Sequence, residues 1–218
     1  AIPGSVTEIG NYAFDSCRSL SEIAVPDGVT SIGRGAFNYC DNLQKIIIPA
    51  SVTYIGDLSE NHAEIWVDEK NETYSSLDGV LFNKAGTTLI HYPSVNSRTE
   101  YAIPDGVKRI DYEAFYKSNL TAVTIPKSVT YITSTAFSNC NKLTDVYYGG
   151  TKSDRGTLGT DNNILQRCTW HYTDGTEEGT GIPKIKAVGT TALPGGTAKV
   201  DIVIENNPGV GMVGFSLN

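Results

Sequence analysis

Apolar residues return at the same positions many times along the chain, separated by polar and small residues. The stretch "IPGSVTEIGNYAFDSC" (2–17) comes back as "VPDGVTSIGRGAFNYC" (25–40) and as "IPKSVTYITSTAFSNC" (125–140). The prolines of adjacent copies stand 22 or 23 residues apart, as between Pro3 and Pro26 or between Pro104 and Pro126. A fixed period of this length predicts a solenoid, in which each repeat buries its apolar face only against its neighbours.

Each repeat divides into two strands and a turn. Segments such as "LSEIAVP" (20–26) and "LTAVTIP" (120–126) alternate between apolar and polar residues, which predicts a strand that ends at its proline. Segments such as "VTSIG" predict a second, shorter strand. The "AF-x-x-C" segment predicts a single helical or 3₁₀ turn that packs its phenylalanine inward. We therefore expect an α/β solenoid that is rich in short parallel strands.

The third copy departs from this pattern. After "VTYIG" the chain reads "DLSENHAEIWV", with no AF-x-x-C, and an insertion delays the next regular copy. Within the insertion, "VLFNKAGTTLIHY" predicts a β-hairpin around "NKAG", which places an inserted hairpin at about residues 78–92. We expect the solenoid to continue through this hairpin to residue 172, with a C-terminal cap at about residues 147–172.

The repeated pattern resembles the BspA-like leucine-rich repeats of bacterial surface proteins over residues 1–172. This resemblance implies a solenoid of the leucine-rich-repeat type, an extracellular or cell-surface location, and adhesion to host matrix, other cells or polymers. Hairpin insertions and a turn that caps the last apolar face are also features of that family.

The composition changes after Tyr172. Residues 173–184 are polar and rich in glycine and threonine, which predicts a linker, and residues 185–218 predict a fragment of a β-sandwich. In this fragment "AKVDIVIE" alternates cleanly, "NNPG" predicts a turn and "GMVGFSLN" begins a further strand. The fragment resembles the opening strands of a cohesin domain, which implies a dockerin-bearing partner for the complete domain; an unrelated Ig-like sandwich is the alternative. If a strand edge stays unpaired, "AKVDIVIE" is the expected donor for pairing with a second chain.

Composition narrows the classes of partner. Hydrophobic residues make up 39% of the 218 residues and charged residues 19%, which is typical of a soluble globular protein. The net charge of −7 argues against nucleic acid and anionic membrane surfaces. No apolar run approaches the roughly 20 residues that span a bilayer. No signal peptide is visible in the given sequence, which we expect to be a piece of a longer chain.

The four cysteines predict no metal site. Cys17, Cys40 and Cys140 occupy the same repeat position, where another copy has Ser118, so the position favours a small stacked side chain. A disulfide between the stacked Cys17 and Cys40 stays open. The pair formed by Cys168 and His171 provides only two ligands, so cap packing is the better interpretation.

No catalytic motif is present in the sequence. It contains no G-x-S-x-G, no P-loop and no dinucleotide fingerprint, and its three histidines are not paired at ligand spacing. We therefore expect a protein that is not an enzyme and carries no cofactor. An enzyme acting on glycans would need a deep cleft with converging acids, which flat repeats seldom form.

The remaining candidate is a surface, because two residues of each long strand point away from the core and align in rows across the concave face. The predicted inner row is Ala24, Ile47, Trp66, His91, Ala102, Thr124 and Tyr147, and the outer row is Glu22, Lys45, Glu64, Glu100, Ala122 and Asp145. The inner row is more aromatic and apolar than a solvated strand face requires, which favours contact with a protein or a sugar. We predict Ile47, Trp66, His91, Thr124, Tyr147, Lys45 and Glu64 as the binding residues. The alternative for Trp66 is local core beneath the inserted hairpin.

Two functions of different class follow. The first is a non-catalytic extracellular bacterial binding or adhesion protein that recognises a protein or a polysaccharide on the concave face. The second is a scaffolding or targeting component of a cellulosome-like polysaccharide-degrading complex, in which the solenoid is an arm and the cohesin-like module docks the partner.

Overall fold

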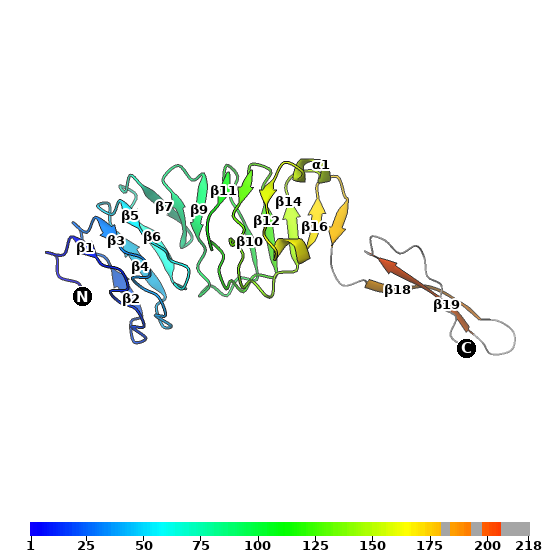
Figure 1. The fold of residues 1–218 in the computed structure, drawn as a ribbon, viewed down its shortest axis with the longest axis horizontal. Coiled ribbons are helices and arrows are strands. Elements are labelled where there is room, and N and C mark those ends of the chain that lie inside the picture. Colours follow the sequence, from blue (N-terminus) through cyan, green and yellow to red (C-terminus); the bar gives the residue numbers. More distant parts are fainter. Residues whose placement is uncertain (180–183, 193–197, 206–218) are drawn as a thin grey trace.

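The predicted solenoid is confirmed. The computed structural model describes residues 1–179, 184–192 and 198–205. Residues 1–179 wind into successive turns that follow one another along a single axis (Figure 1). Each turn contributes a long and a short strand, as the alternation of the sequence predicts, and the structure contains little helix.

The long strands, most of which come just before a proline of the repeat, form two parallel ladders. The first sheet has the order β2-β4-β6, and in the second β10, β12, β14 and β16 follow one another in the same way. The register joins equivalent residues of successive turns, such as Glu22 with Lys45 and Ala122 with Asp145. The long strands are β2 (Glu22–Ala24), β4 (Lys45–Ile48), β6 (Glu64–Val67), β10 (Glu100–Ala102), β12 (Ala122–Ile125), β14 (Asp145–Tyr148) and β16 (Thr169–Tyr172).

The short strands of the "VTSIG" segments form ladders of their own. One sheet has the order β1-β3-β5, and another runs β15-β13-β11-β9 before it reaches the inserted hairpin. These strands are β1 (Glu8–Ile9), β3 (Ser31–Ile32), β5 (Tyr54–Ile55), β9 (Thr88–His91), β11 (Arg109–Ile110), β13 (Tyr131–Ile132) and β15 (Gly159–Thr160).

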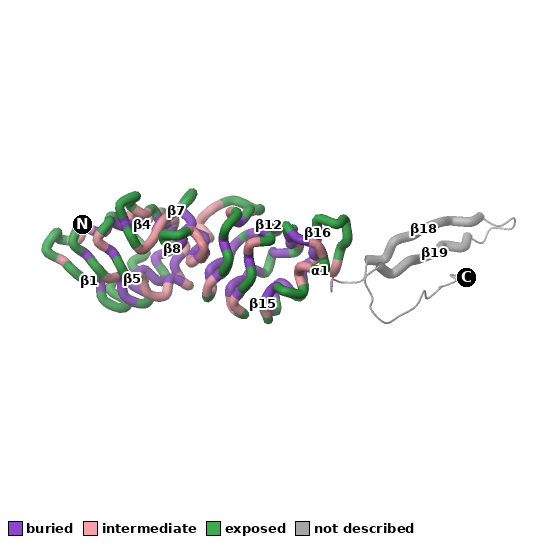
Figure 2. Tube along the Cα trace, turned by 90° about the horizontal axis from the view of Figure 1, so that it is seen from above, coloured by how far each residue is buried: buried purple, intermediate pink, exposed green. Residues whose placement is uncertain are grey.

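The core consists of like residues stacked on like residues. The rings of Phe14 and Phe37 stack with their centroids 5.5 Å apart, and those of Phe115 and Phe137 stack at 4.6 Å. Buried and exposed positions alternate along every turn (Figure 2). The apolar side chains of each turn are therefore buried against those of the next turn. A repeat of 22 or 23 residues has no core of its own and is stable because its neighbours complete one.

The helical or 3₁₀ turn predicted at "AF-x-x-C" is a single turn with the three-residue hydrogen-bond spacing of a 3₁₀ helix, and it does not extend into a helix. Hydrogen bonds between residues three apart follow one another there, for example from the Cys17 N–H to the Phe14 carbonyl. The residue before each Cys or Ser then takes a positive φ, at 58° for Ser16, 54° for Lys117 and 61° for Asn139. This left-handed residue prevents a helix from continuing and turns the chain towards the next strand.

The cysteine position of the repeat is a small buried slot with a defined partner. The thiol of Cys40 donates to the carbonyl of Phe14 at 3.0 Å, and that of Cys140 donates to the carbonyl of Phe115 at 2.9 Å. The Ser118 hydroxyl lies 3.3 Å from the Cys140 sulfur, one turn away in the same slot. All four cysteines are free thiols, so Cys17 and Cys40 are not bridged in this structure.

The inserted hairpin joins two apolar clusters. Strands β7 (Tyr74–Leu77), β8 (Val80–Asn83) and β9 pair antiparallel in that order. Leu81 belongs to the cluster that runs from Ile9 to Ile65, whereas Phe82, the next residue, belongs to the cluster that extends to Tyr172. Because successive side chains of a strand point to opposite faces, β8 connects the two halves of the solenoid.

The C-terminal end is covered by non-repeating elements. Helix α1 (Lys152–Arg155) begins with a capping box between Thr151 and Asp154, and the 3₁₀ helix η1 (Leu165–Arg167) follows. Strand β17 (Glu177–Gly179) then pairs antiparallel with β16. The prediction of a linker over residues 173–184 is therefore wrong for residues 177–179. A turn with Gly175 at a φ of 76° brings these residues back onto the unpaired edge of the sheet.

Two further strands lie beyond the cap. β18 (Lys184–Ala192) and β19 (Ala198–Glu205) pair antiparallel, with an irregularity between Ala187 and Gly189. The predicted turn at "NNPG" and the strand at "GMVGFSLN" lie outside the described residues, as does the binding face of a cohesin-like domain. Among the helices that the structure describes, none has the length and apolar character needed to cross a membrane.

His91 does not lie in the inner row, so this part of the predicted binding site is wrong. It belongs to β9 of the other sheet and is only 4% exposed. The next residue, Tyr92, takes the phenylalanine position of the repeat: its N–H donates to the Ala114 carbonyl at 2.7 Å, as that of Phe115 donates to Ala136 at 2.8 Å. His91 therefore occupies the inward position of Ala114. In the sequence, "LIHYP" resembles the long strands that end at a proline, which is why His91 was predicted in the inner row. The turn of this repeat, between its short strand and the aromatic position, is shorter than in the regular repeats.

We expect Leu81→Ala to lower the free energy of unfolding by roughly 2–5 kcal/mol, because it leaves a cavity where the hairpin enters the N-terminal cluster. The matched control is Leu77→Ala in the same hairpin, whose side chain is 53% exposed and whose loss should change stability by no more than about 0.5 kcal/mol. Urea unfolding of both variants measures the difference. Equal effects of the two substitutions would contradict the role assigned to β8.

We also expect stability to fall as the pH drops from about 6.5 to about 4. Burial lowers the pKa of His91 to about 4, although a hydrogen bond to the Ala63 backbone opposes the shift. In this window the unfolded chain binds a proton at His91 and the folded chain does not, so the free energy of unfolding decreases by up to roughly 1.4 kcal/mol per pH unit.

Urea unfolding between pH 4 and pH 8 measures this dependence. His91→Ala, which installs the residue found at positions 114 and 136, should flatten the curve even where the variant is less stable. His62, whose pKa burial also lowers, contributes a residual slope in both proteins. A slope unchanged in the variant would rule out His91 as its source.

Candidate functional site

The candidate site is the outward side of the two sheets of long strands, which we call the ladder face. The register places Ala24, Ile47 and Trp66 in one row across β2, β4 and β6. In the second sheet the same row comprises Ala102, Thr124, Tyr147 and His171 across β10, β12, β14 and β16. The outer row comprises Glu22, Lys45 and Glu64 in the first sheet and Glu100, Ala122, Asp145 and Thr169 in the second, where Ala122 is buried.

Trp66 is the large aromatic residue of the N-terminal half of this face. Its ring is held from two sides, because the indole N–H donates to a Glu64 carboxylate oxygen at 3.0 Å and the Lys45 ammonium lies 5.3 Å from the ring centroid. The residue is 41% exposed, so it does not form the local core that the sequence left open as an alternative. The result is an indole fixed in orientation and open to solvent.

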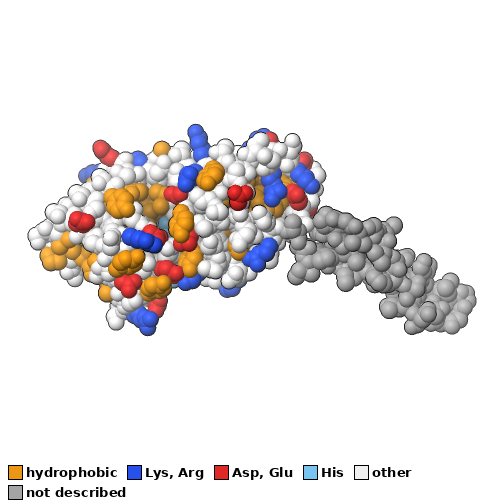
Figure 3. Space-filling model, viewed as in Figure 1, with side chains coloured by type: hydrophobic (Ala, Val, Ile, Leu, Met, Phe, Trp, Pro, Cys, Tyr) orange, Lys and Arg blue, Asp and Glu red, His pale blue; other side chains and the backbone are white. Residues whose placement is uncertain are grey.

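A shallow groove lies beside Trp66. It has a volume of about 260 Å³, and its floor and walls come from the ends of β2, β4 and β6. Its apolar surface comes from the exposed Trp66 and from the half-buried Ile47 and Val67, and Asp27 and Asp68 lie where the chain leaves the strands. In Figure 3 hydrophobic side chains lie in the open over the N-terminal half of the visible face, with acidic and basic side chains among them.

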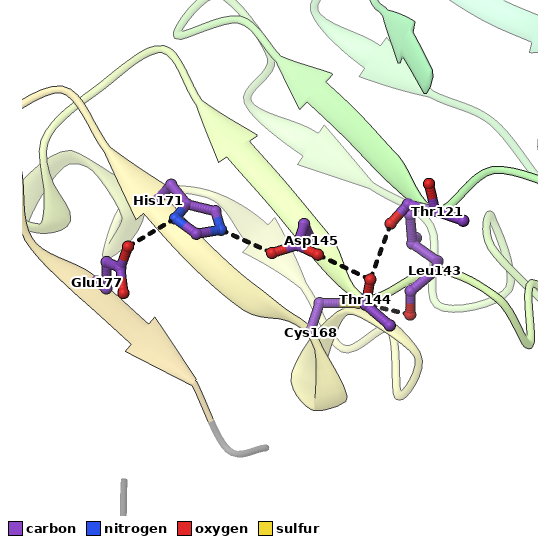
Figure 4. Close-up of polar contacts among 7 residues, drawn as sticks. All are labelled: Thr121, Leu143, Thr144, Asp145, Cys168, His171 and Glu177. Carbon is purple, nitrogen blue, oxygen red and sulfur yellow. Dashed lines mark hydrogen bonds and ion pairs between the residues drawn. The ribbon is translucent and has the colours of Figure 1, made fainter. Parts of the chain in front are cut away.

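A second aromatic cluster lies near the C-terminal cap. The rings of Tyr147 and His171 stack with centroids 4.6 Å apart and planes 15° from parallel, and Tyr147 is 46% exposed. His171 is held between two carboxylates: its Nε2 lies 2.8 Å from Asp145 and its Nδ1 lies 3.0 Å from Glu177 (Figure 4). A contact at each ring nitrogen fixes the orientation of the imidazole. Tyr147 therefore rests on a support that cannot rotate freely.

His171 was not among the residues predicted for this face, because its place after Cys168 favoured cap packing. The available signal was the alternation of "TWHY" (169–172), which matches "DVYY" (145–148) one turn earlier and aligns His171 with Tyr147. Glu177 was also missed, because its strand arises from the pairing of the cap and not from the repeat.

Cys168 and His171, which are three residues apart in the sequence, lie on different sides of the sheet. Cys168 points into the core, where its thiol donates to the carbonyl of Ile164 at 3.3 Å, while His171 lies on the ladder face, so the two do not share a site. Within residues that the structure describes, no group of three or more His, Cys, Asp and Glu side chains could hold a metal ion. The ladder face offers fixed aromatic rings with carboxylates beside them.

Solved structures of similar proteins share the repeat. The pneumococcal vaccine antigen PcpA is 25% identical with a TM-score of 0.51, and the match covers 66% of this chain and 49% of that one. A leucine-rich repeat protein from Eubacterium ventriosum is 26% identical with a TM-score of 0.40, covering 65% and 57%. A leucine-rich cell surface protein from Faecalibacterium prausnitzii is 26% identical with a TM-score of 0.38, covering 73% and 68%. This chain thus spans about half the length of the PcpA structure.

A search of curated proteins finds no match to the chain. The pattern of the BspA type leucine-rich repeat region, by contrast, is matched in six copies over residues 1–75 and 90–155. These ranges hold well over half of the chain and contain most of the strands that carry the ladder face. The chain therefore belongs to the family of BspA-type leucine-rich repeat proteins.

Proposed function

We propose that this chain is a non-catalytic binding module of a bacterial surface protein and that it holds its ligand, a protein or a glycan, on the ladder face. The observation that carries this proposal is the pair of exposed aromatic residues, Trp66 and Tyr147. Trp66 is held by Lys45 and Glu64, and Tyr147 is held by the ring of His171 stacked on it. Rings that are already ordered lose little conformational entropy on binding, which is why aromatic residues dominate the energetics of many interfaces.

The extracellular location is part of the same proposal. It is supported by membership of the BspA-type family and by the description of the Faecalibacterium prausnitzii structure as a leucine-rich cell surface protein. Ile47 and Thr124, which lie in the inner row, and Lys45 and Glu64, which flank Trp66, complete the proposed contact residues. No contact of the described residues supports the second function, the docking of dockerin-bearing enzymes.

The test is to screen the chain on a glycan array and on a panel of host matrix proteins, beside the variant Trp66→Ala/Tyr147→Ala. We expect the variant to bind the ligand at least about 30-fold more weakly, because each ring removed is of the kind that contributes roughly 2 kcal/mol or more at an interface.

The matched control is Tyr54→Ala/Tyr131→Ala, which removes two comparably exposed rings from the short-strand sheets. This control should bind as the unmodified chain does. Loss of binding in the control alone would move the site to the other side of the solenoid. Binding to no member of either screen, by a folded chain, would instead favour a structural arm.

A further inference from the structure

The groove beside Trp66 has the dimensions of a site for one side chain. Its volume of about 260 Å³ lies below the roughly 300–1,000 Å³ of sites that enclose a whole small molecule. Its accessible apolar surface comes from Ile47, Val67 and the Trp66 ring, and its charged lining residues are Asp27 and Asp68. An occupant must therefore have a narrow apolar stem, and its polar end must reach the rim.

The rim is acidic. Asp27 and Asp68 are both exposed, and neither belongs to an ion pair among the residues that the structure describes. Asp68 accepts a hydrogen bond from the Lys70 backbone N–H at 2.8 Å, which orients its carboxylate. Across the outer row of the same sheet, Glu22 and Glu64 stand on either side of a single cation, Lys45. The potential over the groove therefore favours a positively charged group.

The indole already accepts a cation from its own chain. The Lys45 ammonium lies 5.3 Å from the centroid of Trp66, within the distance of about 6 Å at which the ring attracts a positive charge. Glu64 fixes the plane of this ring through the indole N–H. The exposed part of the ring attracts a second cation in the same way, and the aspartates at the rim offset the repulsion from Lys45.

We propose that the Trp66 groove takes a lysine or arginine side chain of a protein partner. The stem of such a side chain lies along Ile47 and Trp66, as long basic side chains do on apolar surfaces, and its charged end reaches Asp27 and Asp68. This inference rests on the proposed function and specifies its partner as a protein with an exposed basic segment. A neutral glycan would stack on the ring and donate hydroxyl hydrogen bonds to the carboxylates, but it would not neutralise their charge.

The probes are a short oligolysine peptide, an oligoglutamate peptide of equal length and a set of neutral oligosaccharides. The chain contains two tryptophans, so nitrogen–proton NMR spectra show two indole signals. Trp170 is buried and its N–H donates to the Leu165 carbonyl at 2.9 Å, which makes its signal an internal reference. We expect oligolysine to shift the Trp66 signal alone, with an affinity that falls as salt is added, and oligoglutamate to shift neither.

Asp27→Asn/Asp68→Asn removes the two charges with little change of shape and should weaken oligolysine binding at least tenfold. The matched control is Asp105→Asn, since Asp105 follows Pro104 in the same "PDG" turn of another repeat but does not line the Trp66 groove. This control should bind as the unmodified chain does.

Equal weakening in both variants, or a Trp66 signal that shifts with neutral oligosaccharides and not with oligolysine, would overturn the basic-partner inference and leave the ladder face as a binding site. A partner from the screens that depends on Trp66 and Tyr147 but not on the aspartates or on salt would have the same meaning. Failure of the proposed function is a separate result, in which binding survives the loss of both rings.

Discussion

The stacking of one turn on the next is the interaction on which the rest of this structure depends. A turn of 22 or 23 residues has no interior of its own, so its valine, isoleucine and phenylalanine side chains are buried only when the neighbouring turn presents the same residues at the same height. The parallel ladders enforce this correspondence, because they join equivalent residues of successive turns. Features that look separate, such as the buried thiol of Cys140 and the left-handed residue before it, are consequences of repeating one turn.

The regular stacking of turns is interrupted at the inserted hairpin. There the core is kept continuous by a strand of the hairpin and not by direct stacking of one turn on the next. Alternation along β8 sends Leu81 into one apolar cluster and Phe82 into the other. The two halves are therefore packed onto a shared strand and not directly onto each other. His91 is part of the adjustment, since the shortened turn at Tyr92 places an imidazole where regular repeats have alanine. Protonation of the buried His91 imidazole destabilises the folded state, and this effect follows from the irregular repeat.

The ladder face also results from the repetition of one turn, because the repeat aligns outward-facing positions as well as core positions. Outward positions recur with each long strand, so a residue that is free of core constraints in one turn has counterparts in all the others. Most of these positions hold small or charged residues, against which Trp66 and Tyr147 stand out. Each ring is held by its neighbours, Trp66 by Lys45 and Glu64 and Tyr147 by the stacked ring of His171. A rigid sheet that carries preordered rings beside carboxylates is suited to recognising a partner without changing shape.

The sequence by itself determined the solenoid, the identity of its two kinds of strand and most members of the two outward rows, because a core made by translation leaves its period in the residues. It also marked the third repeat as irregular. Only the tertiary structure decided how the irregular parts fold. His91 lies inside because Tyr92 and not His91 aligns with Phe115, and Trp66 stays exposed because the hairpin packs beside β6 without covering it. His171 and Glu177 meet because the cap returns a strand to the open edge of the sheet. Such contacts depend on which segments become neighbours in space, and a period in the sequence carries no information about segments that do not repeat.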